Sequence, residues 1–235
     1  MMKPGRRFLS ETFFGKTSLH VGPSREIFCQ GDPASSVFYL RKGTIKLASR
    51  ADSGKQAIVA MLHAGEFFGE GCLLGHAWRR ETATALADCE IEKIEKPAME
   101  RMIRENPAIR EGFLDYLLSR TLRYEQELID QLFNNSERRL GRILLRLANL
   151  GRKQRAPIVP KINQENLAQM IGTTRSRVSY FMNQFRREGL VDYNRRGSLF
   201  VTSRLREVFG PPFGPMSLAS GRHNDVRPNL YADVT

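Results

Sequence analysis

Short runs of alternating apolar and polar residues occupy the first part of the chain, from Leu19 to about Pro97. Alternation at every second residue predicts β-strands with one buried face, and glycine-containing turns separate the runs. Many short strands with little helix between them favour an antiparallel, jelly-roll-like β-roll. The predicted strands fall in segments 25–30, 36–43, 44–49, 56–65, 82–89 and 90–96.

After Asn106-Pro107 the apolar spacing becomes helical and continues to about Phe133. Proline suits the first turn of a helix, so the pattern predicts one long helix. Its two neighbouring apolar stripes suit two partners, namely the β-roll and a second copy of the chain. A single wide stripe facing one core is the alternative. We expect dimerisation through the stripe Leu114, Leu117, Thr121, Tyr124 and Leu128, beside which lie Leu118, Leu122, Ile129 and Leu132.

Two short helical patterns flank Gly172. Asn163 is the expected N-cap of the first helix and Thr173 the expected N-cap of the second. Two short helices around such a turn predict a helix-turn-helix that enters a major groove. On periodicity alone, an αα-hairpin with a solvated face is the alternative. Apolar residues on one side are Leu167, Ala168, Ile171, Val178, Met182 and Phe185, and the opposite face of the second helix holds Ser176, Ser179, Tyr180, Asn183 and Arg187.

The remaining sequence patterns complete the division of the chain into domains. A helix opens at Ser136, a hairpin with its turn at 194–197 forms a wing, and a short helix follows at 203–209. The tail is rich in proline, glycine and polar residues, so we expect it to be disordered. The predicted α+β fold has an arm (1–18), a β-roll (19–105), a dimerisation helix (106–134), a winged helix-turn-helix (135–210) and the tail (211–235).

Charge favours the DNA-binding interpretation. The formal net charge is +12, and residues 134–210 alone hold sixteen Lys and Arg against five Asp and Glu. A basic module that contains a helix-turn-helix indicates a polyanionic partner, here double-stranded DNA. A generally basic protein would carry its charge throughout the chain.

Other classes have little support. No apolar run is long enough to span a membrane, and no secretory signal is visible, so we expect a cytoplasmic protein without a membrane partner. Three scattered cysteines match neither a disulfide framework nor a zinc pattern. The chain has no Walker-type loop, no His-x-x-x-His pair and no nucleophile elbow, so we expect neither an enzyme nor a metal site.

Two motifs resemble the Crp/Fnr superfamily of bacterial transcription regulators. Residues 65–86, GEFFGEGCLLGHAWRRETATAL, resemble its phosphate-binding cassette, and residues 165–191 resemble its DNA-binding signature. The segment 136–148 also resembles the helix that opens the family's DNA-binding domain. The resemblance covers about residues 19–210. It implies a homodimer on a pseudo-palindromic operator, with RNA polymerase as a partner.

The resemblance also implies an effector site. Gly69 and Glu70 match the family's ribose-binding pair, and Thr82 matches the hydroxyl residue beside the phosphate. Alignment on Thr82 places Glu81 at the position of the phosphate-binding arginine, where a carboxylate would repel a phosphate. A one-residue insertion would instead bring Arg80 into that place.

A second position departs from the family pattern. Cyclic-AMP-binding members place a polar Thr-Ser pair against the adenine, where this chain has Tyr124-Glu125. We therefore expect no cofactor, and a roll that serves as a scaffold with another effector or none. A working cyclic AMP site is the alternative. Three scattered cysteines cannot supply the four ligands of an iron-sulfur cluster.

For DNA reading, Arg175 matches the family arginine that contacts a guanine edge. Ser176 and Tyr180 replace the family's usual Glu and Arg, so the preferred half-site should differ. A non-specific architectural DNA-binding protein is a further alternative. Residues suited to phosphates or flanking bases are Thr174, Arg177, Ser179 and Arg187, with Arg195 and Arg196 in the wing.

Overall fold

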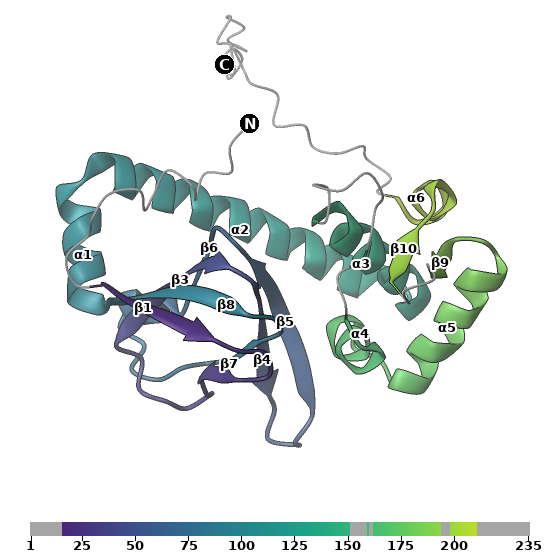
Figure 1. Cartoon of the computed structure of the whole chain (residues 1–235), viewed down its shortest axis with the longest axis horizontal. Coiled ribbons are helices and arrows are strands. Elements are labelled where there is room, and N and C mark those ends of the chain that lie inside the picture. Colours follow the sequence, from purple (N-terminus) through teal and green to yellow (C-terminus); the bar gives the residue numbers. More distant parts are fainter. Residues whose placement is uncertain (1–15, 151–158, 160–161, 194–197, 211–235) are drawn as a thin grey trace, which may run out of the picture.

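A computed structural model of the chain describes residues 16–150, 159, 162–193 and 198–210. In this part an antiparallel β-roll lies beneath one long helix, and a helical domain lies at the far end of that helix (Figure 1). The predicted α+β fold is therefore confirmed. Most of the expected arm, the loop 151–158, the wing turn with Arg195 and Arg196, and the tail lie outside the described residues.

The roll consists of two four-stranded antiparallel sheets. Two strands were not predicted: β6, and β1, which begins at Lys16 inside the segment assigned to the arm. In sheet order, the first sheet contains β1 (Lys16–Val21), β8 (Cys89–Glu95), β3 (Ser36–Lys42) and β6 (Glu66–Phe68). In the second sheet lie β2 (Glu26–Phe28), β7 (Thr82–Ala85), β4 (Thr44–Arg50) and β5 (Gln56–His63).

Strand β3 is covered on both faces, although its alternating pattern predicted one buried face. Phe38 and Leu40 point between the two sheets and pack in the core of the roll. Val37 and Tyr39 point the other way and pack against α1 (Lys96–Glu105) and α2 (Pro107–Phe133). The helices therefore close the outer face of this sheet and form a second core there.

Helix α2 joins the two halves of the molecule. Asn106 caps its start by accepting a hydrogen bond from the backbone N–H of Ile109. Further along, the Tyr116 hydroxyl donates to the carbonyl of Phe67, which fixes α2 to the edge of the roll. Among the described helices, even the 27-residue α2 has no stretch apolar enough to span a bilayer.

The C-terminal domain packs around one apolar core. Its α3 is held to α2 by two ion pairs, Arg142 with Asp130 and Arg146 with Glu127. Helix α4 packs against strand β5 of the roll. The elements of the domain are α3 (Ser136–Leu150), α4 (Gln164–Ile171), α5 (Arg175–Arg187), β9 (Val191–Tyr193), β10 (Leu199–Val201) and α6 (Ser203–Phe209).

The turn between α4 and α5 follows the predicted pattern with one correction. Asn163 caps α4, and Gly172 ends it with a φ of 63°, a conformation that favours glycine. The expectation that Thr173 caps α5 was wrong, because Thr174 Oγ1 accepts from the backbone N–H of Arg177. Either threonine can cap a helix, so sequence could not choose between two neighbours.

Candidate functional site

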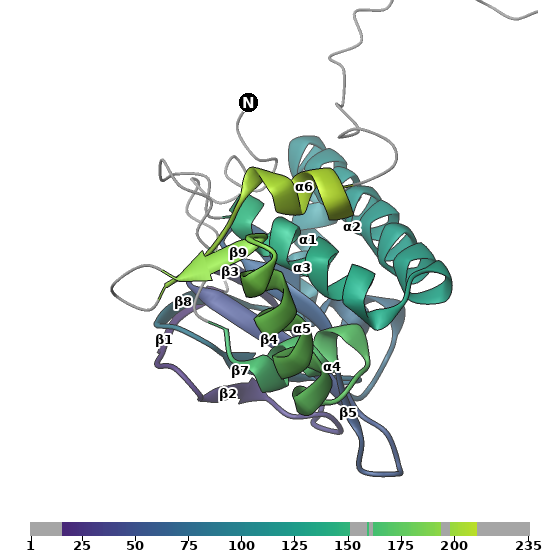
Figure 2. The same cartoon turned by 90° about the vertical axis from the view of Figure 1, so that its right-hand side faces the viewer.

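Helix α5 separates a buried face from an exposed one. Seen from its own end of the molecule, α5 lies on the outer surface, in front of α3 (Figure 2). The buried face consists of Val178, Phe181, Met182 and Phe185. Except for the half-buried Ser179, the predicted DNA-contacting residues of α5 and its cap are exposed; these are Thr174, Arg175, Ser176, Arg177, Tyr180, Asn183 and Arg187.

The start of α5 presents two arginines, Arg175 and Arg177, in different environments. Within the described part of the chain, the exposed Arg175 side chain makes no hydrogen bond or ion pair, so its guanidinium is available to a base edge. Arg177 instead lies 5.8 Å from the centre of the Phe181 ring. Tyr180 is 62 % exposed and is the largest apolar surface on this face. One face thus combines a guanidinium, hydroxyls, an amide and an aromatic ring.

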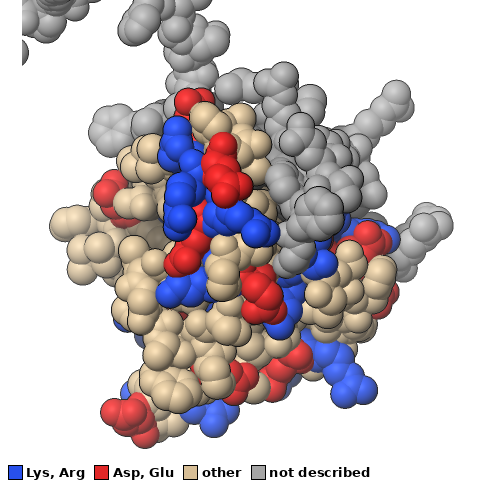
Figure 3. All heavy atoms as spheres, turned by 90° about the vertical axis from the view of Figure 1, so that its left-hand side faces the viewer, with Lys and Arg blue, Asp and Glu red and all other residues tan. Residues whose placement is uncertain are grey.

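The opposite end of the molecule has a different surface. Figure 3, which shows the end that carries α1, has Lys and Arg interspersed with Asp and Glu. Near this end, lysines are paired with glutamates in two ion pairs, Lys93 with Glu95 and Lys96 with Glu100. Such a mixed surface offers no continuous basic patch for DNA on the part that Figure 3 displays.

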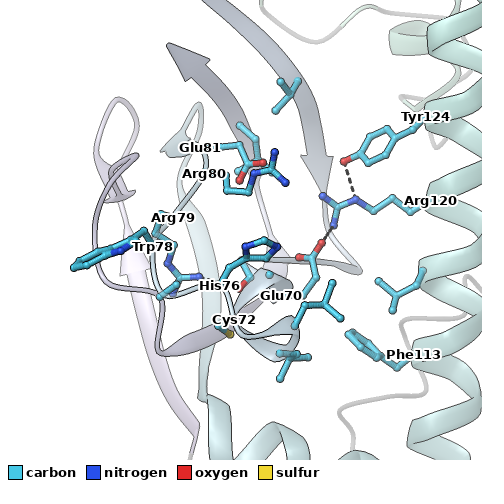
Figure 4. A pocket seen from close by; sticks show the side chains of 18 of the residues that line it. Glu70, Cys72, His76, Trp78, Arg79, Arg80, Glu81, Phe113, Arg120 and Tyr124 are labelled. Carbon is cyan, nitrogen blue, oxygen red and sulfur yellow. Dashed lines mark hydrogen bonds and ion pairs between the residues drawn. The ribbon is translucent and has the colours of Figure 1, made fainter. Parts of the chain in front are cut away.

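A second candidate site is a cavity of about 770 Å³ in the roll. It lies between the 3-10 helix η2 (Glu70–Leu74), the residues that lead into β7, and the inner side of α2 (Figure 4). Four of the five predicted effector residues line it, namely Gly69, Glu70, Arg80 and Tyr124. Apolar lining residues include Leu73, Trp78, Ile103, Phe113, Leu114 and Leu117.

An ion pair crosses this cavity from η2 to α2. The Arg120 guanidinium donates to Glu70 Oε1 at 2.6 Å and to the Tyr124 hydroxyl at 2.7 Å. It also reaches the Phe67 carbonyl and the Tyr116 hydroxyl at 3.3 and 3.4 Å. Burial is the largest single effect and acts to lower the pKa of Arg120, but the charge of Glu70 and the contacts with Tyr116 and Tyr124 together outweigh it, so the pKa is raised. Arg120 therefore stays charged, and sequence reasoning missed it because nothing in the helical spacing distinguishes it.

Arg79 has a structural role that the sequence did not reveal. Its guanidinium is buried, donates to the carbonyls of Gly69 and Ser36 at 2.8 Å each, and lies over the rings of Phe28 and Phe38. Gly69 has a φ of 73°, and a Cβ there would lie 2.5 Å from Nη1 of Arg79. The loop before η2 therefore requires glycine for both its conformation and its contact with Arg79.

Beyond Arg79, Arg80 is exposed and Glu81 is half-buried, and both line the cavity opposite Arg120 and Tyr124 (Figure 4). The Glu81 carboxylate makes no hydrogen bond or ion pair with any described residue. Thr82, by contrast, is not among the lining residues, and its hydroxyl accepts a hydrogen bond from the backbone N–H of Gln30 at 3.0 Å.

The predicted dimerisation stripe is split between two environments. Leu114, Thr121 and Leu128 are exposed along α2, whereas Leu117 is half-buried and packs on the core beneath the helix. Tyr124 accepts a hydrogen bond from Arg120 and lines the cavity. Most exposed apolar surface on α2 instead follows both predicted stripes, through Leu114, Leu118, Leu122, Leu128, Ile129 and Leu132.

Two models of known protein families match the chain, one over the β-roll and one over the DNA-binding domain. The family model described as "Cyclic nucleotide-binding domain" matches residues 18–106, and that described as "Crp-like helix-turn-helix domain" matches residues 138–206. Together they define a class of proteins in which a nucleotide-binding-type roll accompanies a DNA-binding helix-turn-helix.

Individual relatives support the same class. The chain is 30 % identical over 168 residues to the "Cyclic AMP receptor protein" of Thermus thermophilus, covering 71 % of this chain and 76 % of the relative. It is 28 % identical over 187 residues to the "cAMP-activated global transcriptional regulator CRP" of Haemophilus influenzae, covering 76 % and 82 %. The chain belongs to the Crp/Fnr family of transcription regulators, as its motifs predicted.

Solved structures share the fold. The global regulator CLP of Xanthomonas campestris, described as c-di-GMP responsive, matches with a TM-score of 0.70 and 18 % identity over 84 % of this chain and 97 % of CLP. FixK2 of Bradyrhizobium japonicum matches with a TM-score of 0.71 and 17 % identity over 82 % and 96 %. These likenesses support the arrangement of roll, long helix and helix-turn-helix.

The carboxyl of Glu81 predicts a dependence of stability on pH. Burial, and then the negative charge of Glu70, raise the pKa of Glu81 above its ordinary value of 4.5. The folded state therefore holds this proton to higher pH than the unfolded state, and stability falls as the pH rises above 4.5. Glu81→Gln removes that loss, so the variant should be more stable than the parent protein near neutral pH and equally stable at about pH 4.

Denaturant unfolding at both pH values measures the difference. Asp52→Asn is the matched control, since Asp52 is an exposed carboxylate in the turn after β4. Equal stability of the Glu81→Gln variant and the parent protein at neutral pH would contradict the expected effect.

Proposed function

We propose that the chain is a sequence-specific regulator that binds a pseudo-palindromic operator as a homodimer, with α5 as its recognition helix. The observation that carries this proposal is the exposed polar face of α5 above an apolar face with four buried side chains. A helix of this kind at the molecular surface can enter a major groove. In a dimer, two such helices would read half-sites about one helical turn, roughly 34 Å, apart.

Dimerisation is supported by the exposed apolar residues of α2. Leu118 and Leu122 are each more than half exposed and lie one helical turn apart. Further along, Leu128, Ile129 and Leu132 continue this surface. Contiguous apolar surface on a helix indicates a packing partner, and a second α2 supplies a matching face. We propose that this surface, wider than the predicted stripe, forms the dimer contact.

We further propose that the protein works in the cytoplasm, next to RNA polymerase, and carries no catalytic activity. Support comes from the family relationship, since the two relatives compared above are named as a regulator and a receptor. Base contacts by α5 distinguish this function from architectural DNA binding, which would protect no defined site in a footprint.

For the effector, we propose that cyclic AMP is not the ligand, although the relatives' names include it. Glu81 lines the cavity beside η2, where its carboxylate opposes a phosphate. Tyr124 and Glu70 are both engaged by Arg120. Arg80 also lines the cavity, and this is the observation that favours the alternative of a working nucleotide site.

Arg175 should contact a guanine edge. Arg175→Ala is expected to weaken binding to the preferred operator by about 1–3 kcal/mol and to relax specificity at one base pair of each half-site. Titration against operators that differ at single positions measures both effects. As a comparison, removal of Arg195 and Arg196 together should weaken binding to all sequences and reduce its salt dependence. An equal loss on every sequence for Arg175→Ala would make it a phosphate contact only.

The apolar surface of α2 should hold the dimer. Changing Leu118 and Leu122 together to Glu buries two charges at the proposed contact, so sedimentation should show a monomer with much weaker operator binding. Val208→Glu is the control, because Val208 is also half exposed but lies on α6. A double variant that remains dimeric would show that the chain associates elsewhere.

Cyclic AMP should bind poorly. Calorimetric titration of the full chain is expected to give no saturable heat in the micromolar range, because Glu81 replaces a cation beside the phosphate. Clear micromolar binding would restore the cyclic-AMP-dependent alternative and assign the phosphate contact to Arg80.

A further inference from the structure

The cavity in the roll contains two acceptor groups that lack donors. One oxygen of Glu70 accepts from Arg120, while Oε2 of Glu70 is buried with no hydrogen-bond partner among the described residues. The half-buried Glu81 carboxylate is likewise without a described partner. A carboxylate oxygen out of contact with water is costly unless a donor reaches it, so Oε2 of Glu70 calls for a donor from a ligand. The half-buried carboxylate of Glu81 lines the same cavity and offers a second acceptor.

The cations around the cavity are unequal in their ability to attract an anion. The two terminal nitrogens of Arg79 donate to two carbonyls and its guanidinium lies over two aromatic rings, which leaves only its buried Nε without a described partner. Arg120 donates to Glu70 and Tyr124. Arg80 is exposed, so water and salt screen its charge more than they screen the half-buried Glu81. The same screening applies to Arg110, which also lines the cavity and is exposed. Next to Glu70 and Glu81 the cavity therefore favours a hydrogen-bond donor over an anion.

The rest of the cavity is apolar. Leu73 of η2 and Ile103 of α1 form one part of the wall, and Phe113 and Leu117 of α2 form another. Trp78 lies at the outer side and is 62 % exposed. A volume of about 770 Å³ accommodates a ligand well above the size of a solvent molecule.

We propose that this cavity binds an amphipathic small molecule whose non-anionic head group donates hydrogen bonds to Glu70 and Glu81 and whose apolar body lies against Phe113 and Leu117. A primary amine is the simplest such head group, since it can donate to both carboxylates at once. This inference depends on the proposed function in one respect, because it takes the β-roll to be the domain that binds the effector.

Matched probes test the head group. The full chain is titrated with 4-phenylbutylamine, 4-phenylbutanol and 4-phenylbutyrate, which share one apolar body and differ in charge. Trp78 is the only tryptophan of the chain, so its fluorescence reports occupancy of the cavity directly, and calorimetry gives an independent affinity. The amine should bind tightest and the carboxylate weakest. Tighter binding of the carboxylate, or binding of none of the three, would overturn the proposal.

Substitution of Glu81 tests whether this side chain causes the expected preference for the amine over the carboxylate. Glu81→Gln should weaken amine binding about tenfold, because it removes a charge-assisted hydrogen bond, and should strengthen carboxylate binding, because it removes a repelling negative charge. Glu81→Arg should reverse the order of amine and carboxylate. The control Asp52→Asn, outside the cavity, should leave all three affinities unchanged. Unchanged amine affinity in both Glu81 variants would also overturn the proposal.

Operator binding by the same variants is measured separately, without any probe. Asp52→Asn lies outside both the cavity and α5, so its footprint should match that of the parent protein. If no probe binds but the footprint remains, the ligand class is wrong and the DNA-binding function stands. If the footprint is absent for the parent protein, the proposed function fails whatever the probes do.

Discussion

The ion pair between Arg120 and Glu70 fixes the long helix α2, which connects the two halves of the molecule, to the β-roll. It joins the loop of the β-roll to the long helix, with an N–O distance of 2.6 Å and both side chains largely covered. Because a mostly buried charge without its partner is strongly unfavourable, loss of either residue would destabilise the contact between α2 and η2. The position of α2 in turn sets the cavity on one side and the proposed dimer surface on the other.

The same side chains border a second cleft. Arg120 and Tyr124 also line a small space between β5, α2, α3 and α4, next to the Arg146–Glu127 ion pair. One polar network therefore lies against both the ligand cavity and the contact between the roll and the DNA-binding domain. A ligand that competes with Arg120 for Glu70 would change the contacts of Arg120, which lines both the ligand cavity and this second cleft.

Long periodic elements could be predicted from the sequence, and side-chain directions in loops could not. Helices α2 and α5 follow the 3.6-residue period, so their bounds were predicted closely, and so was the buried face of α5 apart from Phe181. The buried face of α2 was predicted wrongly, because the helix buries Ile109, Phe113 and Tyr116, which belong to neither predicted stripe. Strand β6 was missed because its three residues follow directly on the predicted segment 56–65 and include two adjacent phenylalanines, Phe67 and Phe68, that do not alternate with polar residues. Likewise, Arg79 and Arg80 are adjacent before a strand, and only the fold shows that Arg79 turns into the core while Arg80 faces the cavity.

Selection of bound sequences from a random DNA pool tests the central claim most directly, when it is carried out at a stated salt concentration with and without cyclic AMP. The account predicts enrichment of a pseudo-palindrome whose half-sites lie one helical turn apart, equally strong with and without the nucleotide. Absence of any enriched motif under either condition would contradict a sequence-specific dimeric regulator. Enrichment only with cyclic AMP would contradict the assignment of the cavity to a different ligand.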